Sequence, residues 1–146
     1  MKEDKHFLNL KYKEGSIFME IKNLDHLVLT VSNIDDTVDF YSNVLGMEKI
    51  QFGDNRTALK FGNQKINLHH VTNIIKPSAS NPKPGSADLC FITETHIEEV
   101  EAQLKQHRVP IELGPVNRTG AMGDILSIYV RDPDNNLIEI SNYKHE

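Results

Sequence analysis

The chain has 146 residues and a mass of 16.6 kDa, the size of one ordinary domain. Its 16 Lys and Arg against 21 Asp and Glu give a net charge of −5, which argues against nucleic acid as a partner because a phosphate backbone attracts a basic surface. We expect neither a membrane span, a secretory signal nor a disulfide, because long apolar runs are missing, the first residues are charged and Cys90 is the single cysteine. The expected location is the cytoplasm.

Residues 1–20 have few apolar side chains and no regular period. We predict that they form a frayed or loosely docked leader, and that residues 21–143 form the domain.

The first half of the domain, residues 21–72, begins with a strand from Asp25 to Val31. Its alternation places His26 on the face opposite Leu27 and Leu29. Ser32 stands three residues before Asp35, a capping-box spacing that predicts a helix start. The helix pattern ends at a glycine, and three strands are expected after it, over residues 48–52, 57–61 and 65–71. The half therefore has the order βαβββ.

Residues 73–85 form a proline-rich linker that is either a spacer or a functional loop. The second half, residues 86–143, repeats the βαβββ order. A strand over 88–93 is followed by a second capping box at Thr95 and Glu98 and by a helical stripe. Strands are expected near residues 111–113, 125–131 and 136–142. The run Ser32–Asp36 and the run Thr95–Glu99 share a cap, an isoleucine and an acidic pair, which indicates an internal duplication.

The fold class expected from this duplication is α+β, with paired βαβββ modules forming a curved eight-stranded mixed sheet. Helices would cover its outer face and a cleft would lie on its inner face. Burial of the apolar neighbours would direct five polar side chains into that cleft: His26, Asn67, His69, Asp88 and Glu139. The assignment of Asp88 depends on how the two halves are aligned. The gapless offset of 63 residues places Asp88 opposite Asp25, and a shift of one residue places it opposite His26. Imidazole, carboxylate and other nitrogen or oxygen donors are the ligands that divalent transition ions prefer. The sequence therefore predicts a site for one divalent ion: Zn, Ni, Mn or Fe(II).

Three sequence runs, Leu24–Val31, Asp39–Met47 and Asp132–Ile140, resemble the vicinal oxygen chelate superfamily of glyoxalase I, bleomycin-resistance proteins and extradiol dioxygenases. The likeness covers about residues 21–143 and is greatest to the glyoxalase domain-containing protein 5 subgroup. The resemblance implies the glyoxalase/bleomycin resistance/dioxygenase fold and a homodimer.

The resemblance also implies metal ligands. The family's ligands on the first and last strands fall on His26 and Glu139. Its fifth-strand histidine falls on Asp88, and its fourth-strand Glu or Gln falls on Asn67. His69, two residues further on, would stand in as a ligand or serve as a base. The two replacements predict little glyoxalase I activity.

Two functions are consistent with the sequence. The first is a metal-dependent lyase or isomerase that acts on a small oxygen-rich substrate through an enolate or alkoxide stabilised by the ion. Glu139 or His69 would move the proton. Asn67 and Arg118 would bind the substrate, although Arg118 is equally well explained as an exposed surface charge. The second is a protein of the bleomycin-resistance type that sequesters a small molecule without turnover.

Overall fold

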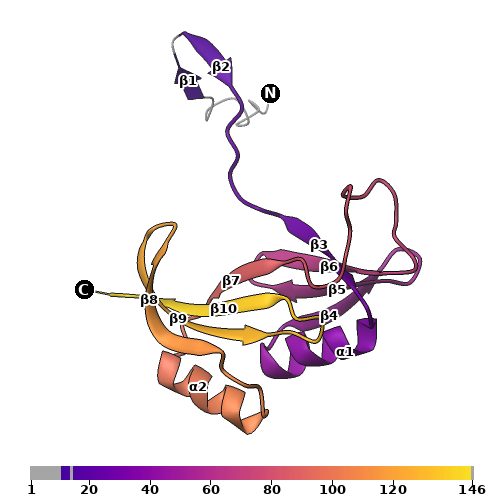
Figure 1. The fold of residues 1–146 in the computed structure, drawn as a ribbon. Coiled ribbons are helices and arrows are strands. Elements are labelled where there is room, and N and C mark those ends of the chain that lie inside the picture. Colours follow the sequence, from indigo (N-terminus) through magenta and orange to yellow (C-terminus); the bar gives the residue numbers. More distant parts are fainter. Residues whose placement is uncertain (1–10, 14, 146) are drawn as a thin grey trace, which may run out of the picture.

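The computed structural model describes residues 11–13 and 15–145. The first ten residues of the predicted leader therefore lie outside the described residues. Within the leader, β1 (Lys11–Lys13) and β2 (Ser16–Phe18) pair as a short antiparallel hairpin, so that part of it has regular structure. An extended segment joins this hairpin to the body of the molecule (Figure 1).

The first module has the expected βαβββ order, but its helix starts differently from the prediction. Asn33 is the N-cap residue, and its side-chain oxygen accepts a hydrogen bond of 2.9 Å from the backbone N–H of Asp36. The predicted capping box of Ser32 and Asp35 is therefore wrong, and the backbone N–H of Ser32 donates to Asp134 instead. The elements are β3 (His26–Val31), α1 (Ile34–Asp39), the π-helical segment η2 (Phe40–Val44), β4 (Glu48–Phe52), β5 (Arg56–Phe61) and β6 (Gln64–His70).

The second module repeats this order after the linker. His96 occupies the N-cap position of its helix and makes no side-chain capping bond, so the predicted Thr95–Glu98 box is also wrong. The elements are β7 (Asp88–Ile92), α2 (Ile97–Gln106), β8 (Leu113–Gly120), β9 (Gly123–Arg131) and β10 (Leu137–Tyr143).

Strand β8 is longer than expected and carries Arg118 on a strand. A register shift between Leu113 and Val116 allows the strand to continue, and a tight hairpin then pairs Gly120 with Gly123.

The predicted paired βαβββ modules of an α+β fold are confirmed. The eight strands of the two modules form two hydrogen-bonded mixed sheets of four, in the orders β3-β6-β5-β4 and β7-β10-β9-β8. In each module the first strand runs parallel to the last, and the remaining pairs are antiparallel. Both helices lie on one side of the sheets (Figure 1).

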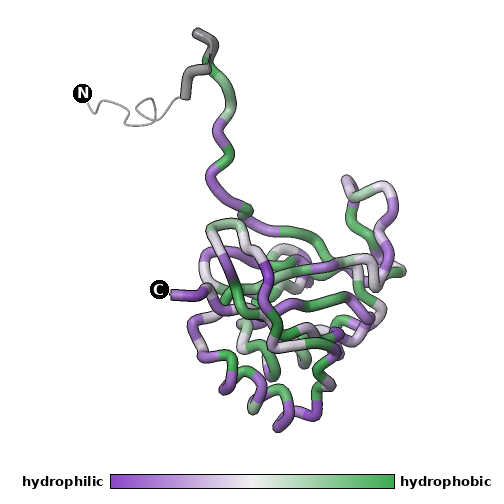
Figure 2. Tube along the Cα trace, turned by 60° about the vertical axis from the view of Figure 1, so that its left-hand side comes forward, coloured by the Kyte–Doolittle hydropathy of each residue, from purple (hydrophilic) through white to green (hydrophobic). Residues whose placement is uncertain are grey.

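One apolar core joins the two modules. The Phe91 ring of β7 contacts the rings of Tyr41 and Phe61 edge-on, at 6.5 and 5.3 Å between centroids. Tyr41 is completely buried, and its hydroxyl donates a 2.8 Å hydrogen bond to Asp132 of the second module. Figure 2 shows hydrophobic and hydrophilic residues alternating along the strands, the pattern of sheets with one covered face. No helix among residues 11–13 and 15–145 is long and apolar enough to cross a membrane.

Candidate functional site

The parallel pairing of β3 with β6 decides which polar residues meet on the inner face of the first module. His26 is level with Lys65, Val28 with Asn67, and Thr30 with His69. The His26 ring is half exposed, and its Nδ1 lies 2.7 Å from the Asp25 carboxylate. A carboxylate at one ring nitrogen fixes the orientation of the imidazole and leaves Nε2 available for another partner.

Asn67 and His69 lie deep in the same face, each about 5% exposed. The Asn67 Oδ1 atom and both ring nitrogens of His69 have no hydrogen-bond partner among the described residues. Burial, with a smaller contribution from the Arg56 guanidinium, lowers the pKa of His69, which favours the neutral imidazole at neutral pH. A neutral imidazole offers one N–H donor and one nitrogen acceptor.

The same register separates His69 from His26. His69 is level with Thr30, four residues along β3 from His26, and a strand rises about 3.3 Å per residue. The two histidines are therefore roughly 13 Å apart along the strand direction. Zinc–nitrogen bonds of about 2.0–2.1 Å do not span that separation. Within one chain His69 does not join His26 as a ligand of one ion.

Asp88 and Glu139 share the inner face of the second module. β7 pairs with β10 so that Asp88 is level with Leu137 and Cys90 with Glu139. This register settles the alignment left open by the sequence, because it also packs Leu89 against the shared core. Asp88 and Glu139 are diagonal neighbours, with Cα atoms about 8 Å apart, a separation at which both carboxylates reach one ion.

Two serines orient the Glu139 carboxylate. Ser127 donates a 2.6 Å hydrogen bond to Oε2, and Ser141 donates to the same oxygen at 3.5 Å. The serine hydroxyls are also 2.7 Å from each other. Tyr129 and Cys90 also interact with the Glu139 carboxylate, which raises the pKa of both groups.

Arg118 lies on the same face, on the neighbouring hairpin. Its Nε donates a 3.0 Å hydrogen bond to the hydroxyl of Tyr129, and its guanidinium lies 5.5 Å from the centre of that ring. Burial raises the pKa of Tyr129, and the Arg118 hydrogen bond opposes this rise. A cavity of about 380 Å³ is lined by Arg118, Glu139, Cys90 and Tyr143, among others.

Cys90 is exposed on the inner face, level with Glu139. Its sulfur lies 3.4 Å from the Ser141 hydroxyl, directly beside Glu139 in the register. Partial burial raises the pKa of the thiol, the Glu139 charge adds to this rise, and the Ser141 hydrogen bond opposes it.

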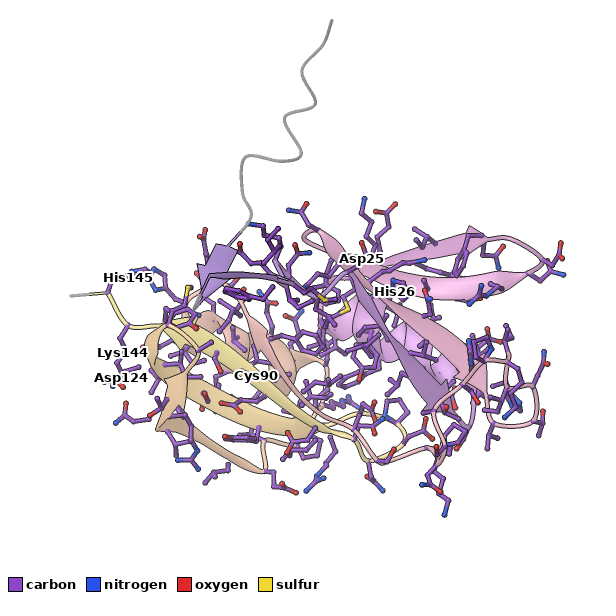
Figure 3. The ribbon with its side chains drawn as sticks, turned by 90° about the horizontal axis from the view of Figure 1, so that it is seen from above. Asp25, His26, Cys90, Asp124, Lys144 and His145 are labelled. Carbon is purple, nitrogen blue, oxygen red and sulfur yellow. The ribbon has the colours of Figure 1, made fainter. Side chains whose placement is uncertain are left out.

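The predicted ligands thus fall into two sets, one on each module. His26, Asn67 and His69 lie on the first sheet, and Asp88 and Glu139 lie on the second. Figure 3 shows His26 beside Asp25 and well separated from Cys90, the neighbour of Glu139. Across residues 11–13 and 15–145, no three His, Cys, Asp or Glu side chains are grouped as a metal site.

Four further site residues were missed by sequence reasoning: Asp25, Ser127, Tyr129 and Ser141. Strand alternation alone places Ser141 on the face of Glu139, so that this signal was present in the sequence. Asp25 precedes the strand, and Ser127 and Tyr129 depend on the pairing register, which the sequence does not state.

Known proteins resemble this chain along most of its length. A model of the Glyoxalase/Bleomycin resistance protein/Dioxygenase superfamily matches residues 23–140. Virulence protein STM3117 of Salmonella typhimurium is 57% identical over 136 residues, which is 92% of this chain and 94% of that protein. Its crystal structure superimposes with a TM-score of 0.85 and covers 86% of this chain and 100% of that one.

Two other relatives have more specific names. The glyoxalase domain-containing protein RDO1 of Mycosarcoma maydis is 52% identical over 126 residues, covering 86% of this chain and 71% of that protein. The metallothiol transferase FosB of Staphylococcus epidermidis is 28% identical over 123 residues, covering 84% and 82%.

Proposed function

Because the chain belongs to the Glyoxalase/Bleomycin resistance protein/Dioxygenase superfamily, we propose that it is a metal-dependent enzyme acting on a small oxygen-rich substrate. One observation carries the proposal: the side chains of His26 and Glu139 are each oriented by a neighbouring polar group. Asp25 holds Nδ1 of His26, and two serines hold one oxygen of Glu139. Oriented donors of this kind are typical of metal ligands. A metallothiol transferase among the relatives is consistent with this assignment.

The residues present fit one divalent ion. His26 supplies imidazole nitrogen, and the diagonal pair Asp88 and Glu139 supplies two carboxylates. Asn67 occupies the position in the first module that Glu139 occupies in the second, but its amide oxygen is a weaker ligand for a transition ion. We assign the ion to His26, Asp88 and Glu139, which leaves coordination positions for substrate oxygens.

We further propose that two copies of the chain are needed to assemble this set. The supporting observation is that the inner faces expose large apolar side chains: Val28 is 48% exposed, Ile92 50% and Leu113 45%. In a two-fold dimer, the first module of one copy would face the second module of its partner. His26 of one copy would then complete the carboxylate pair of the other.

The bound ion would polarise a substrate oxygen and stabilise the negative charge that develops on it. The chain's own residues supply the remaining functions. Arg118, held by the Tyr129 hydroxyl, would bind a substrate carboxylate. The unpartnered Asn67 oxygen would accept a hydrogen bond from a substrate hydroxyl. The Glu139 carboxylate, besides holding the ion, would accept a proton from the carbon beside the polarised oxygen. This is proton transfer of the isomerase or lyase kind.

Equilibrium dialysis against Zn, Ni, Mn and Fe(II) tests the ligands. We expect His26→Ala and Glu139→Gln each to weaken binding at least about tenfold, roughly 1.4 kcal/mol. His96→Ala and Glu99→Gln change exposed residues at the start of α2 and serve as matched controls. If neither test variant weakens binding, the assignment fails, and sequestration of a small molecule without turnover becomes the better explanation.

A mixing experiment tests the shared site. Each variant alone lacks a ligand in every site, but a mixed dimer of His26→Ala and Glu139→Gln has one intact site. With free exchange of subunits, equal amounts should restore about a quarter of the wild-type sites. Light scattering should report about twice the chain mass of 16.6 kDa. A monomer, or a mixture that restores no binding, would contradict a site shared between copies.

A further inference from the structure

A second cavity lies between the inner face of the first module and the linker. Its volume is about 370 Å³, within the range of small-ligand pockets. The linker stands on the side of the sheet opposite the helices (Figure 1), so that it rises over β3 and β6. Residues from the sheet and from the linker line the cavity, among them Val28, Thr30, His69, Pro77, Ser78 and Lys83.

His69 distinguishes this cavity from an ordinary gap beneath a loop. The side chain is 95% buried and lines the cavity, and neither ring nitrogen has a hydrogen-bond partner among residues 11–13 and 15–145. Buried polar groups in native proteins are nearly always paired, because an unpaired one loses its hydrogen bonds to water without replacement. A neutral imidazole offers one N–H donor and one nitrogen acceptor, so the His69 ring fits a ligand that carries both a hydrogen-bond acceptor and a hydrogen-bond donor.

The charges around the cavity indicate the sign of the ligand. The lining residues include Lys83 and no Asp or Glu. Arg56 is close enough to His69 to lower the pKa of its ring. A buried anion is stabilised by nearby cations and by N–H donors, and both are present here.

We propose that this cavity binds a small carboxylate that bears a hydroxyl group. The N–H of His69 donates a hydrogen bond to a carboxylate oxygen of the ligand. The other ring nitrogen accepts a hydrogen bond from the ligand's hydroxyl group, and the Lys83 ammonium balances the charge of the carboxylate. This site is separate from the proposed ion site. His69 is level with Thr30, which lies roughly 13 Å along β3 from the proposed ligand His26. The inference therefore does not rest on the metal assignment.

The test uses the full chain in EDTA, with glycolate as the probe and acetate and ethylene glycol as comparison compounds. Acetate lacks the hydroxyl, and ethylene glycol lacks the charge. We expect glycolate to bind at millimolar concentration and to shift the His69 ring signals in nitrogen-15 NMR spectra. His69→Phe preserves much of the ring's shape and should weaken glycolate at least tenfold. His70→Gln, on the opposite face of the same strand, is the matched control and should leave binding unchanged.

A second variant keeps the test informative if His69→Phe does not fold. Lys83→Gln changes an exposed linker residue and should weaken glycolate several-fold without altering the binding of ethylene glycol. Three results would overturn the proposal: no shift of the His69 signals, a cavity that holds water only, or equal affinity in His69→Phe. Glycolate binding that needs a divalent ion and Glu139 would also overturn it while supporting the metal site.

Discussion

The hydroxyl of Tyr41 is the best-defined polar link between the two modules, and its removal is a sharp test of how the halves hold together. Tyr41 is 0% exposed and donates a 2.8 Å hydrogen bond to Oδ2 of Asp132, itself 5% exposed. Asp132 also accepts hydrogen bonds from Asp134 and from the backbone and side chain of Asn136, at 2.8–2.9 Å. In Tyr41→Phe the carboxylate loses one donor and retains three.

A hydrogen bond to a charged group contributes about 1.5–3 kcal/mol. Because Asp132 keeps its other donors, we expect a loss of about 2 kcal/mol in the free energy of unfolding. For a chain of this size that corresponds to roughly 4–8 °C in Tm. Differential scanning calorimetry measures it, and Tyr143→Phe is the comparison, since the partly exposed Tyr143 hydroxyl accepts only an exposed hydrogen bond from the backbone N–H of Met122. A decrease below about 1 °C would refute the reasoning.

The pH dependence of the same pair gives a second measure. Burial, followed by the Asp132 charge and hydrogen bond, raises the pKa of Tyr41 well above its ordinary value of 10.0. The folded state therefore holds the phenol proton more tightly than the unfolded state. This contribution is complete below pH 10 and is lost as pH rises above 10, where the unfolded tyrosine ionises. Stability of the wild type should fall more steeply above pH 10 than stability of Tyr41→Phe.

Three other outcomes follow from the site and the leader. Cys90 should react with iodoacetamide at pH 7.5 more slowly than an ordinary thiol, because partial burial and then the Glu139 charge raise the pKa of the thiol. Glu139→Gln should accelerate this reaction, which mass spectrometry measures. Deletion of residues 1–20 should leave Tm within about 2 °C, because Ile17, Met19 and other described side chains there are mostly exposed; a larger loss in calorimetry would show that the leader docks. Turnover of the methylglyoxal–glutathione hemithioacetal with added Zn or Ni should be negligible in a spectrophotometric assay, since Asn67 and Asp88 replace stronger ligands; robust turnover would contradict this.

The sequence predicted which face each polar side chain occupies, but not how far apart the side chains lie. Alternation along a strand is a local property, so the inward positions of His26, Asn67 and Glu139 follow from their apolar neighbours. The distance between His26 and His69 depends on the register of a parallel pair whose strands are far apart in sequence. Register is set by tertiary packing, so His69 was assigned to an ion that it does not share with His26 within one chain.

The helix starts show the same limit at short range. Ser32 and Asn33 are both good N-cap residues, and each is followed three residues later by an aspartate. Spacing therefore does not distinguish them. The structure uses Asn33, whose side-chain oxygen accepts the hydrogen bond from the N–H of Asp36, while the backbone N–H of Ser32 donates to Asp134 of the second module.

In the proposed site, the duplication would divide the holding of an ion and the holding of a substrate between the two modules. Val28 is level with Asn67 in the first module, as Cys90 is level with Glu139 in the second. The equivalent positions carry an amide in one module and a serine-oriented carboxylate in the other. In that proposal, two carboxylates and one imidazole would neutralise a divalent ion, and a third carboxylate at residue 67 would add a negative charge where the substrate's oxygens are proposed to bind. The amide oxygen of Asn67 can still accept a hydrogen bond from a substrate hydroxyl, and it carries no negative charge that would repel the substrate's oxygens. Asn67→Asp should therefore strengthen binding of the bare ion and weaken binding of an anionic substrate, and a variant that strengthens both would refute this division of roles.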